Sequence, residues 1–156
     1  MKVEKIITTI IPLEVEIKDI TLLSIDEYEA CKNTVPSVDG WWWLRSPGYY
    51  SNSAASVDRG GGVDDDGNYV DYDHYAVRPA LVYESNYLQF EDKVKILNYT
   101  WTVISKNILL CDDIVGYTCF REDWRVDDAN DYEKSDIKKW LENWWKERVK
   151  KCNETN

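Results

Sequence analysis

The pattern of apolar and polar positions in residues 3–23 is dominated by β-branched side chains and predicts two or three strands, broken at Pro12. The next four residues, 24–27 (SIDE), form a capping box. In this motif the serine hydroxyl and the glutamate carboxylate each pair with an otherwise unpaired backbone N–H. The motif predicts a short helix to about Lys32, followed by a loop over 33–40.

Two apolar segments frame the middle of the chain. Residues 41–46 (WWWLRS) predict a strand that ends at a Pro-Gly turn, and residues 77–84 (VRPALVYE) predict another, in which the proline indicates an edge or a bulge. Residues 49–75 contain four glycines and no Leu, Ile, Phe, Trp, Lys, Glu, Gln or Met. This segment is expected to be mostly loop, with short strands near 54–58 and 67–71.

The second half of the chain has strand-like segments followed by a helix. Residues 93–98, 99–105 and 108–111 predict a β-meander, and a strand-like segment follows at 114–120 before a charged loop. Ser135 is expected to cap a final helix over 136–150, whose apolar residues follow helical spacing and are Ile137, Trp140, Leu141, Trp144 and Trp145. An aromatic stripe of this kind favours docking on the sheet over binding to a membrane surface. The fold class is therefore α+β, with short antiparallel strands, two helices and one long loop region.

Composition restricts the class of protein. The 156 residues suit a single domain over 1–156, and the core is rich in aromatic side chains, with 8 Trp and 11 Tyr. A net charge of −10 argues against a nucleic-acid partner. No apolar run reaches the length of about 18 residues that membrane insertion needs. With no recognisable signal peptide, a cytoplasmic or phage-particle location is expected.

Cysteine and histidine give little support to catalysis. The four cysteines contain no C-x-x-C pair and are interpreted as reduced thiols, with a Cys111–Cys119 bridge as the alternative if the two lie on neighbouring strands. His74 is the only histidine, and its polar surroundings indicate a surface loop. The acidic run 64–66 does not fit an EF-hand in either register, so it is interpreted as a solvated turn, with an irregular calcium site as the alternative. The Gly60-Gly61-Gly62 run lacks the ending of a phosphate loop and indicates a hairpin tip. No metal and no cofactor is expected.

The composition of 49–75 indicates a binding surface. Tyr, Ser, Asn, Asp and His make up most of the segment, and such side chains combine rigid contact area with adaptable hydrogen bonding. The alternative is a polar loop with no special role. The contacts expected to bind the ligand are Tyr49, Tyr50, Asn52, Tyr69, Tyr72, Asp73, His74 and Tyr75.

The sequences WWWLRSPG (41–48) and AVRPAL (76–81) resemble a bacterial and phage domain of unknown function with the pattern WWLRSPG…VRPAL. That domain is similar to the C-type-lectin fold, in the branch shared with formylglycine-generating enzymes and with variable proteins of diversity-generating retroelements. Residues 98–113 and 135–145 resemble the family's other half. The two halves, 20–83 and 93–150, stand in reversed order, so the chain resembles a circularly permuted member. Exchange of halves between two chains is the alternative.

The resemblance implies roles for several residues. Trp41, Trp42 and Trp43 would pack beneath the loops, and Arg45 and Arg78 would anchor the loops through polar contacts. Residues 49–75 would form the ligand face. Retroelement diversification turns AAC codons into NNC, which cannot encode Lys, Glu, Gln, Met or Trp, and the segment contains none of these.

Three functions remain open at this stage. The leading hypothesis is a non-enzymatic module that binds a protein or glycan ligand, with an oligomeric state that stays open. The second is a phage or mobile-element accessory protein that binds one host protein, for which the acidic surface would suit a basic partner. The third is an enzyme of the formylglycine-generating type. It is disfavoured because that family uses paired cysteines and residues 41–81 contain none.

Overall fold

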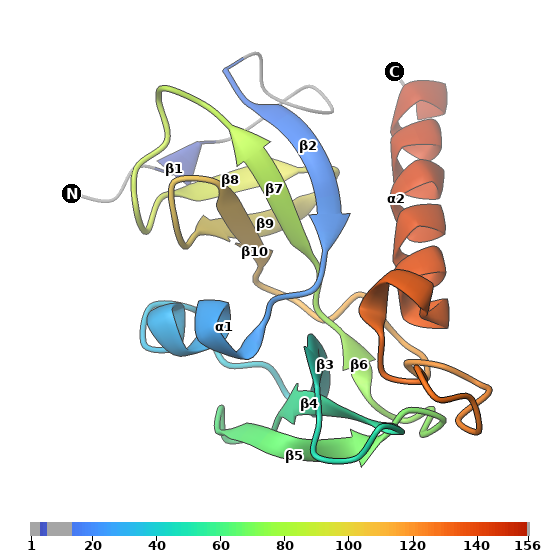
Figure 1. Ribbon diagram of the computed structural model, residues 1–156. Coiled ribbons are helices and arrows are strands. Elements are labelled where there is room, and N and C mark those ends of the chain that lie inside the picture. Colours follow the sequence, from blue (N-terminus) through green and yellow to red (C-terminus); the bar gives the residue numbers. More distant parts are fainter. Residues whose placement is uncertain (1–3, 6–13, 156) are drawn as a thin grey trace.

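The computed structural model describes residues 4–5 and 14–155, and within them the chain forms two β-sheets and two α-helices, an α+β fold (Figure 1). One sheet has the strand order β1-β8-β9-β10-β7-β2 and the other β11-β6-β3-β4-β5. The first sheet consists of β1 (Glu4–Lys5), β2 (Glu16–Thr21), β7 (Ala80–Glu84), β8 (Lys93–Ile96), β9 (Tyr99–Val103) and β10 (Ile108–Cys111). The second consists of β3 (Trp42–Pro47), β4 (Ser53–Val57), β5 (Val63–Tyr69), β6 (Ala76–Val77) and β11 (Gly116–Tyr117). The helices are α1 (Ile25–Cys31) and α2 (Asp136–Thr155), and a 3-10 turn covers Tyr132–Lys134.

Both halves of the chain contribute strands to the first sheet. β7 pairs antiparallel with β10 on one side and with β2 on the other. Strand pairing therefore connects the part of the chain that ends at β7 with the part that begins at β8. In Figure 1, α2 stands alongside this sheet next to β2.

The start of the described chain follows the expected pattern. Ser24 accepts a hydrogen bond from the Glu27 amide at 3.1 Å, and the Glu27 carboxylate accepts one from the Ser24 amide at 2.9 Å, so the capping box is confirmed. The predicted break at Pro12 and the β-branched run before it lie outside the described residues.

The sheets are mixed, which corrects the expectation of antiparallel strands alone. β1 pairs parallel with β8, and β3 pairs parallel with β6. The second case follows from the path of residues 70–75. β5 ends beside the β3–β4 turn, and these residues then run back to the Trp42 end of β3, so β6 starts where β3 starts.

Residues 49–75 are mostly turn and loop, as expected, because β4 and β5 together cover less than half of the segment. The two strands pair as a hairpin, and its tip is the triglycine run, also as expected. The predicted strand at 67–71 was displaced, and the acidic run 64–66 lies within β5 instead of forming a turn. β5 is the edge of its sheet, and charged side chains on an edge strand prevent pairing with other chains.

In the last third of the chain, the predicted elements are present but differ in length from the prediction. α2 runs to Thr155, five residues beyond the expected end, and Ser135 Oγ accepts from the Lys138 amide at 3.1 Å, which confirms the predicted cap. The meander is confirmed, but β8 and β9 are separated by Leu97 and Asn98, both with positive φ. The strand expected at 114–120 is reduced to Gly116–Tyr117.

The aromatic stripe of α2 packs against the protein core. Ile137 and Leu141 are fully buried, and Trp140, Trp144 and Trp145 are partly buried against the same cluster. The docked-helix interpretation is therefore confirmed. In the described part of the chain, no helix has the length and apolar character required to cross a bilayer.

Candidate binding surface

The turn between β3 and β4 presents two tyrosines to solvent. The Gly48 amide donates to Ser53 O at 2.7 Å, and the Tyr49 amide donates to Asp66 O at 2.9 Å, which ties the turn to both neighbouring strands. The side chains of Tyr49 and Tyr50 are 74% and 60% exposed, and their rings meet edge to face at 4.9 Å. The backbone is thus fixed by hydrogen bonds while the rings remain available for contact.

The side chains of Ser53 and Asn130 form hydrogen bonds with the backbone of this turn. Ser53 Oγ is buried and accepts from the Tyr50 amide at 3.0 Å. Asn130, from the charged loop before α2, donates through Nδ2 to Tyr50 O and Ser53 O, each at 3.1 Å. The backbone of this loop also reaches the turn, where the Asn130 amide donates to Ser51 O at 3.1 Å. The second half of the chain therefore holds the turn in place.

Further tyrosines lie at the same end of the β4–β5 hairpin. Tyr69 is paired with Ser53 across the hairpin, and the Tyr72 amide donates to Tyr69 O at 3.0 Å. The Val70 amide donates to Asn52 O at 2.9 Å, so the backbone after β5 lies against the turn. Tyr69 and Tyr72 are both exposed. The sequence-predicted tyrosines 49, 50, 69 and 72 are therefore brought to one end of one sheet.

A series of ring contacts continues from Tyr72. Its ring meets His74 at 5.3 Å and Tyr75 at 5.1 Å, and Tyr75 stacks on Trp41 at 5.6 Å with an interplanar angle of 21°. Trp41 is exposed, which differs from the buried position expected from the tryptophan run, because it precedes β3 at the margin of the sheet. Sequence reasoning missed it as a surface residue. The sequence feature that could have indicated an exposed position is that Trp41 is the first residue of the apolar run and directly follows a glycine.

The remaining predicted contacts differ in exposure. Asn52 is half-buried, and the side chains of Asp73 and His74 are exposed, with 3.4 Å between Asp73 Oδ1 and His74 Nε2. Tyr75 is only 9% exposed and belongs to the core cluster, and burial raises the pKa of its hydroxyl. Its side chain therefore offers little surface to a ligand, unlike the other tyrosines expected to bind. Trp41 and Trp43 lie on one face of the chain, and the Tyr75 ring contacts both.

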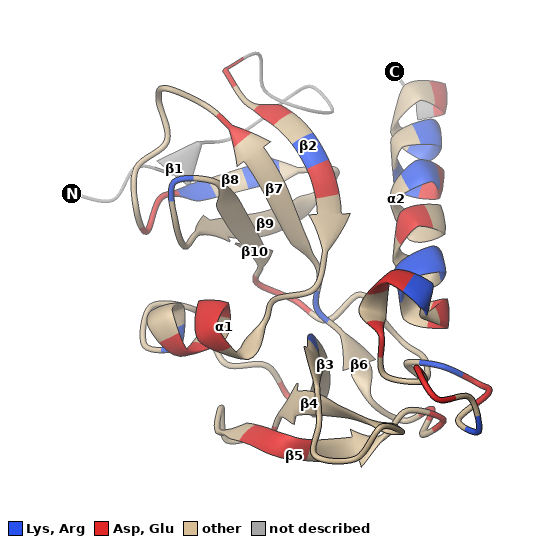
Figure 2. Cartoon of the chain, in the orientation of Figure 1, with Lys and Arg blue, Asp and Glu red and all other residues tan. Residues whose placement is uncertain are grey.

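The hairpin around these tyrosines is acidic. Asp64, Asp65 and Asp66 lie consecutively on β5, and Asp71 and Asp73 follow it, which gives the red stretch of β5 in Figure 2. Within 49–75 only Arg59 carries a positive charge at neutral pH if His74 is neutral. The potential at this surface is therefore expected to be negative.

Trp42, Arg45 and Arg78 do not directly support the four exposed tyrosines at 49, 50, 69 and 72, which we call the tyrosine surface. Trp42 is 1% exposed and packs against Tyr28 of α1, so its predicted core role is observed. Arg45 donates to Leu22 O at 2.7 Å and to both carboxylate oxygens of Glu27, which fixes α1. Arg78 donates to Pro36 O and to Cys111 O. Both arginines are anchors, but they anchor α1, the loop after it and β10, not residues 49–75.

The cysteines that could have supplied a reactive pair are buried. Cys31, Cys111 and Cys119 are thiols outside any disulfide, so a Cys111–Cys119 bridge is not present. Burial raises the pKa of Cys31 to about 11 and of Cys111 to about 12, and it also raises the pKa of Cys119. Among the described residues, no group of three His, Cys, Asp or Glu side chains has an arrangement that could hold a metal ion.

Comparison with known proteins gives one result. Residues 14–85, slightly less than half of the chain, match the model of a family described as a domain of unknown function (DUF6273). The match covers β2 to β7 and so includes α1 and the complete tyrosine surface. This confirms similarity to a domain of unknown function in the segment with WWLRSPG and VRPAL. No curated protein and no solved structure matches the chain.

Proposed function

We propose that this protein is a non-enzymatic binding module whose ligand face is the tyrosine surface, defined by Tyr49, Tyr50, Tyr69 and Tyr72 with Trp41 and His74 beside them. The observation that carries the proposal is the gathering of these four exposed tyrosines on hydrogen-bonded backbone at one end of the β3–β4–β5 sheet. Exposed aromatic side chains on a rigid support are typical of protein contact sites, since they bury much area at low entropic cost.

The charge around the surface favours a basic protein as the ligand. Five aspartates lie on β5 and directly after it, in a chain of net charge −10. A partner with lysines and arginines would gain both electrostatic steering and contacts with the tyrosine faces. A neutral glycan is the alternative ligand and would gain only from stacking on the rings.

The scaffold proposed for this surface is a C-type-lectin-like fold in permuted order. The two mixed sheets, the two helices and the β7–β10 pairing that joins the halves support it. The composition of 49–75 supports a further proposal, that the segment is diversified as in retroelement variable proteins. Sequencing the gene across a population of its source tests this, because diversification would concentrate substitutions in 49–75 at AAC-type codons, whereas a segment as constant as the scaffold would overturn it.

An enzyme of the formylglycine-generating type is less well supported. That chemistry needs reactive thiolates, but Cys111 and Cys119 are buried and the pKa of each thiol is raised, so both are protonated at neutral pH. Copper-dependent oxidation of a cysteine peptide by the purified protein would contradict the non-enzymatic proposal.

Affinity capture from a lysate of the source organism tests the proposed function. The wild-type protein is immobilised beside a variant in which Tyr49, Tyr50, Tyr69 and Tyr72 are each replaced by Ser. The expected result is a basic protein that is retained by the wild type, lost from the variant and released when the salt concentration is raised to about 0.5 M.

The matched control replaces two exposed aromatic residues elsewhere. Tyr87 and Phe90 lie in the connector between β7 and β8 and are 67% and 55% exposed. The double variant Tyr87→Ser, Phe90→Ser should capture the same protein as the wild type. Equal retention by the four-tyrosine variant would refute the proposed surface, and selective binding of the wild type to a glycan array would replace the protein ligand by a glycan.

A further inference from the structure

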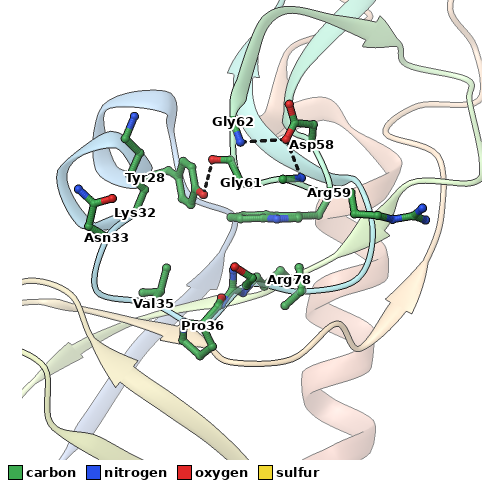
Figure 3. A pocket seen from close by; sticks show the side chains of 14 residues that line it. Tyr28, Lys32, Asn33, Val35, Pro36, Asp58, Arg59, Gly61, Gly62 and Arg78 are labelled. Atoms are coloured by element: carbon green, nitrogen blue, oxygen red, sulfur yellow. Dashed lines mark hydrogen bonds between the residues drawn. The ribbon is translucent and has the colours of Figure 1, made fainter.

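A second candidate site lies at the other end of the β4–β5 hairpin. The tyrosine surface is at the Ser53–Tyr69 end, whereas a cavity of about 400 Å³ adjoins the hairpin tip at Gly60, Gly61 and Gly62. Figure 3 shows Tyr28 and Lys32 from α1 and the adjacent turn on one side of this cavity, the hairpin tip on another, and Arg78 beside Val35 and Pro36. A volume of this size is within the range of small-molecule sites.

Arg78 is a buried cation without a carboxylate partner. Its side chain is 1% exposed, its Nε donates to Cys111 O at 2.7 Å, and its Nη2 donates to Pro36 O at 2.8 Å. Among the described residues no hydrogen bond is made by Nη1 and no ion pair by the guanidinium. Since a guanidinium has five N–H donors, three of them lack a protein acceptor.

This arrangement is unusual because buried charges are normally paired. The aromatic face of Trp42, 5.0 Å from Arg78 Cζ, compensates part of the charge. Desolvation lowers the pKa of Arg78, because burial disfavours the charged form of the guanidinium. An anion in the cavity would supply the missing acceptor and the missing negative charge together.

Among the charged residues that line the cavity, Arg78 is the cation for which the described part of the chain provides no ion pair. Lys32, Arg59 and Arg78 line it, against a single acid, Asp58. Lys32 and Arg59 are partly neutralised by Glu29 and Asp39, which pair with them at 2.8 Å and 3.0 Å. Counted with these partners, the cations and acids at the cavity balance, so the unpaired Arg78 is the group that favours a negatively charged ligand.

The glycine tip distinguishes between kinds of anion. Gly60 and Gly62 both donate their amides to Asp58 Oδ1 at 2.9 Å, and the Gly61 amide donates to Asp58 O at 3.0 Å. The backbone donors that could surround a phosphate are therefore already occupied. A carboxylate needs only the two parallel N–H donors that one guanidinium edge provides.

The apolar part of the cavity lining indicates the body of the ligand. Trp42 and Tyr28 meet edge to face at 5.2 Å, and Val35 and Val38 belong to the loop that closes the cavity. Planar rings gain contact area from such walls. We propose that this cavity binds a small aromatic monocarboxylate, with its carboxylate on the Nη1 edge of Arg78 and its ring among Tyr28, Trp42 and the two valines.

Benzoate and its neutral isostere benzamide test the charge requirement on the wild-type protein. Ligand titrations followed by NMR chemical shifts should show benzoate bound at least about 10-fold more tightly than benzamide or inorganic phosphate. Equal affinity for benzamide, tighter binding of phosphate, or no shift with benzoate at saturating concentration would each overturn the proposal.

Two variants and a control locate the binding. Arg78→Lys keeps the charge but removes the planar fork and should weaken benzoate binding by about 10-fold or more. Val38→Trp fills the cavity from the loop and should abolish binding. It tests the site independently of Arg78→Lys, which matters if that variant fails to fold. Arg125→Lys, at an exposed arginine outside the cavity, should leave benzoate affinity unchanged. Retained affinity in a folded Val38→Trp variant would place benzoate elsewhere and overturn the proposal.

Discussion

The two internal arginines have different electrostatic partners, and this difference decides what each contributes. Arg45 forms a two-point contact with the Glu27 carboxylate, with 3.1 Å from Nη2 to Oε2. Arg78 has carbonyl oxygens as hydrogen-bond acceptors, the Trp42 ring at 5.0 Å and the charge of Asp112 beyond ion-pair distance. The first arrangement stabilises the start of α1, whereas the second leaves binding capacity for an anion.

The Glu27 contact predicts a dependence of stability on pH. Desolvation raises the pKa of Glu27, but hydrogen bonds from Arg45 and the Ser24 amide lower it by more, so the pKa is below its usual value. A depressed pKa in the folded state means that the charge stabilises the fold above the unfolded value of about 4.3, and that this contribution is lost as pH falls through the folded pKa.

Glu27→Gln isolates this effect because glutamine can keep the capping hydrogen bond but not the charge. Urea unfolding should give a loss of about 1 kcal/mol relative to wild type at pH 7, which shrinks toward zero at about pH 3. Glu29→Gln is the control, since its exposed pair with Lys32 should contribute little at either pH. A Glu27→Gln deficit that is the same at both pH values would contradict the assignment.

At the scale of elements, the β4–β5 hairpin depends on a glycine that brings two backbones close together. Gly67 has φ +81°, and a Cβ at this position would lie 2.1 Å from Ala54 O. Because Gly67 precedes the strand end that carries Tyr69, a shift here would move the tyrosine surface. Neither the positive φ nor the close contact is visible in a sequence that offers seven glycines.

Gly67→Ala should therefore destabilise the protein by about 2–4 kcal/mol, from the left-handed backbone and the clash with β4 together. Gly60→Ala at the hairpin tip is the matched control, because its Cβ would meet only the Asp58 side chain at 3.4 Å and should cost well under half as much. Chemical denaturation measures both. Similar losses for the two variants would show that the close backbone approach at Gly67 is not what stabilises the hairpin.

The elements that could be predicted are those with local signals. The capping box at Ser24 and the apolar stripe of α2 each determine their element through near neighbours, and both were confirmed. β5 was misplaced because its strand conformation comes from pairing with β4 and not from the propensity of three consecutive aspartates.

The candidate site was predictable in composition but not in position. Tyrosines at 49, 50, 69 and 72 are exposed as expected, but Tyr75 is buried by Trp41 and Trp43, a contact that depends on the path of residues 70–75 across the sheet. The role of Asn130 could not be foreseen, since it bonds a turn almost eighty residues earlier in the chain. The cavity at Arg78 likewise requires segments from α1, β4–β5 and β6–β7 to meet.

At the scale of the whole molecule, the two halves share one sheet. β10 pairs with β7 through Ile108–Leu110 opposite Ala80–Val82, and the connector between β7 and β8 carries the exposed side chains Tyr87 and Phe90. Long-range strand pairing of this kind holds a chain together even when a surface connector is cut.

A protease site inserted between Asn86 and Tyr87 tests this arrangement. After cleavage, the two fragments should elute together at the size of the intact protein under native conditions and separate only in denaturant. The uncut protein with the same insertion is the control for its native elution position. Fragments that separate under native conditions would show that the β7–β10 pairing does not join the halves.

The central claim is that the tyrosine surface binds the ligand, and the most direct measurement is the affinity of the captured partner for three proteins. Calorimetric titration should give the wild type and the Tyr87→Ser, Phe90→Ser control the same dissociation constant. The variant with Ser at 49, 50, 69 and 72 should bind at least about 100-fold more weakly, because exposed tyrosines at a contact centre each contribute of the order of 1 kcal/mol or more. Equal affinity of all three folded proteins would contradict the account and place the binding site elsewhere on the molecule.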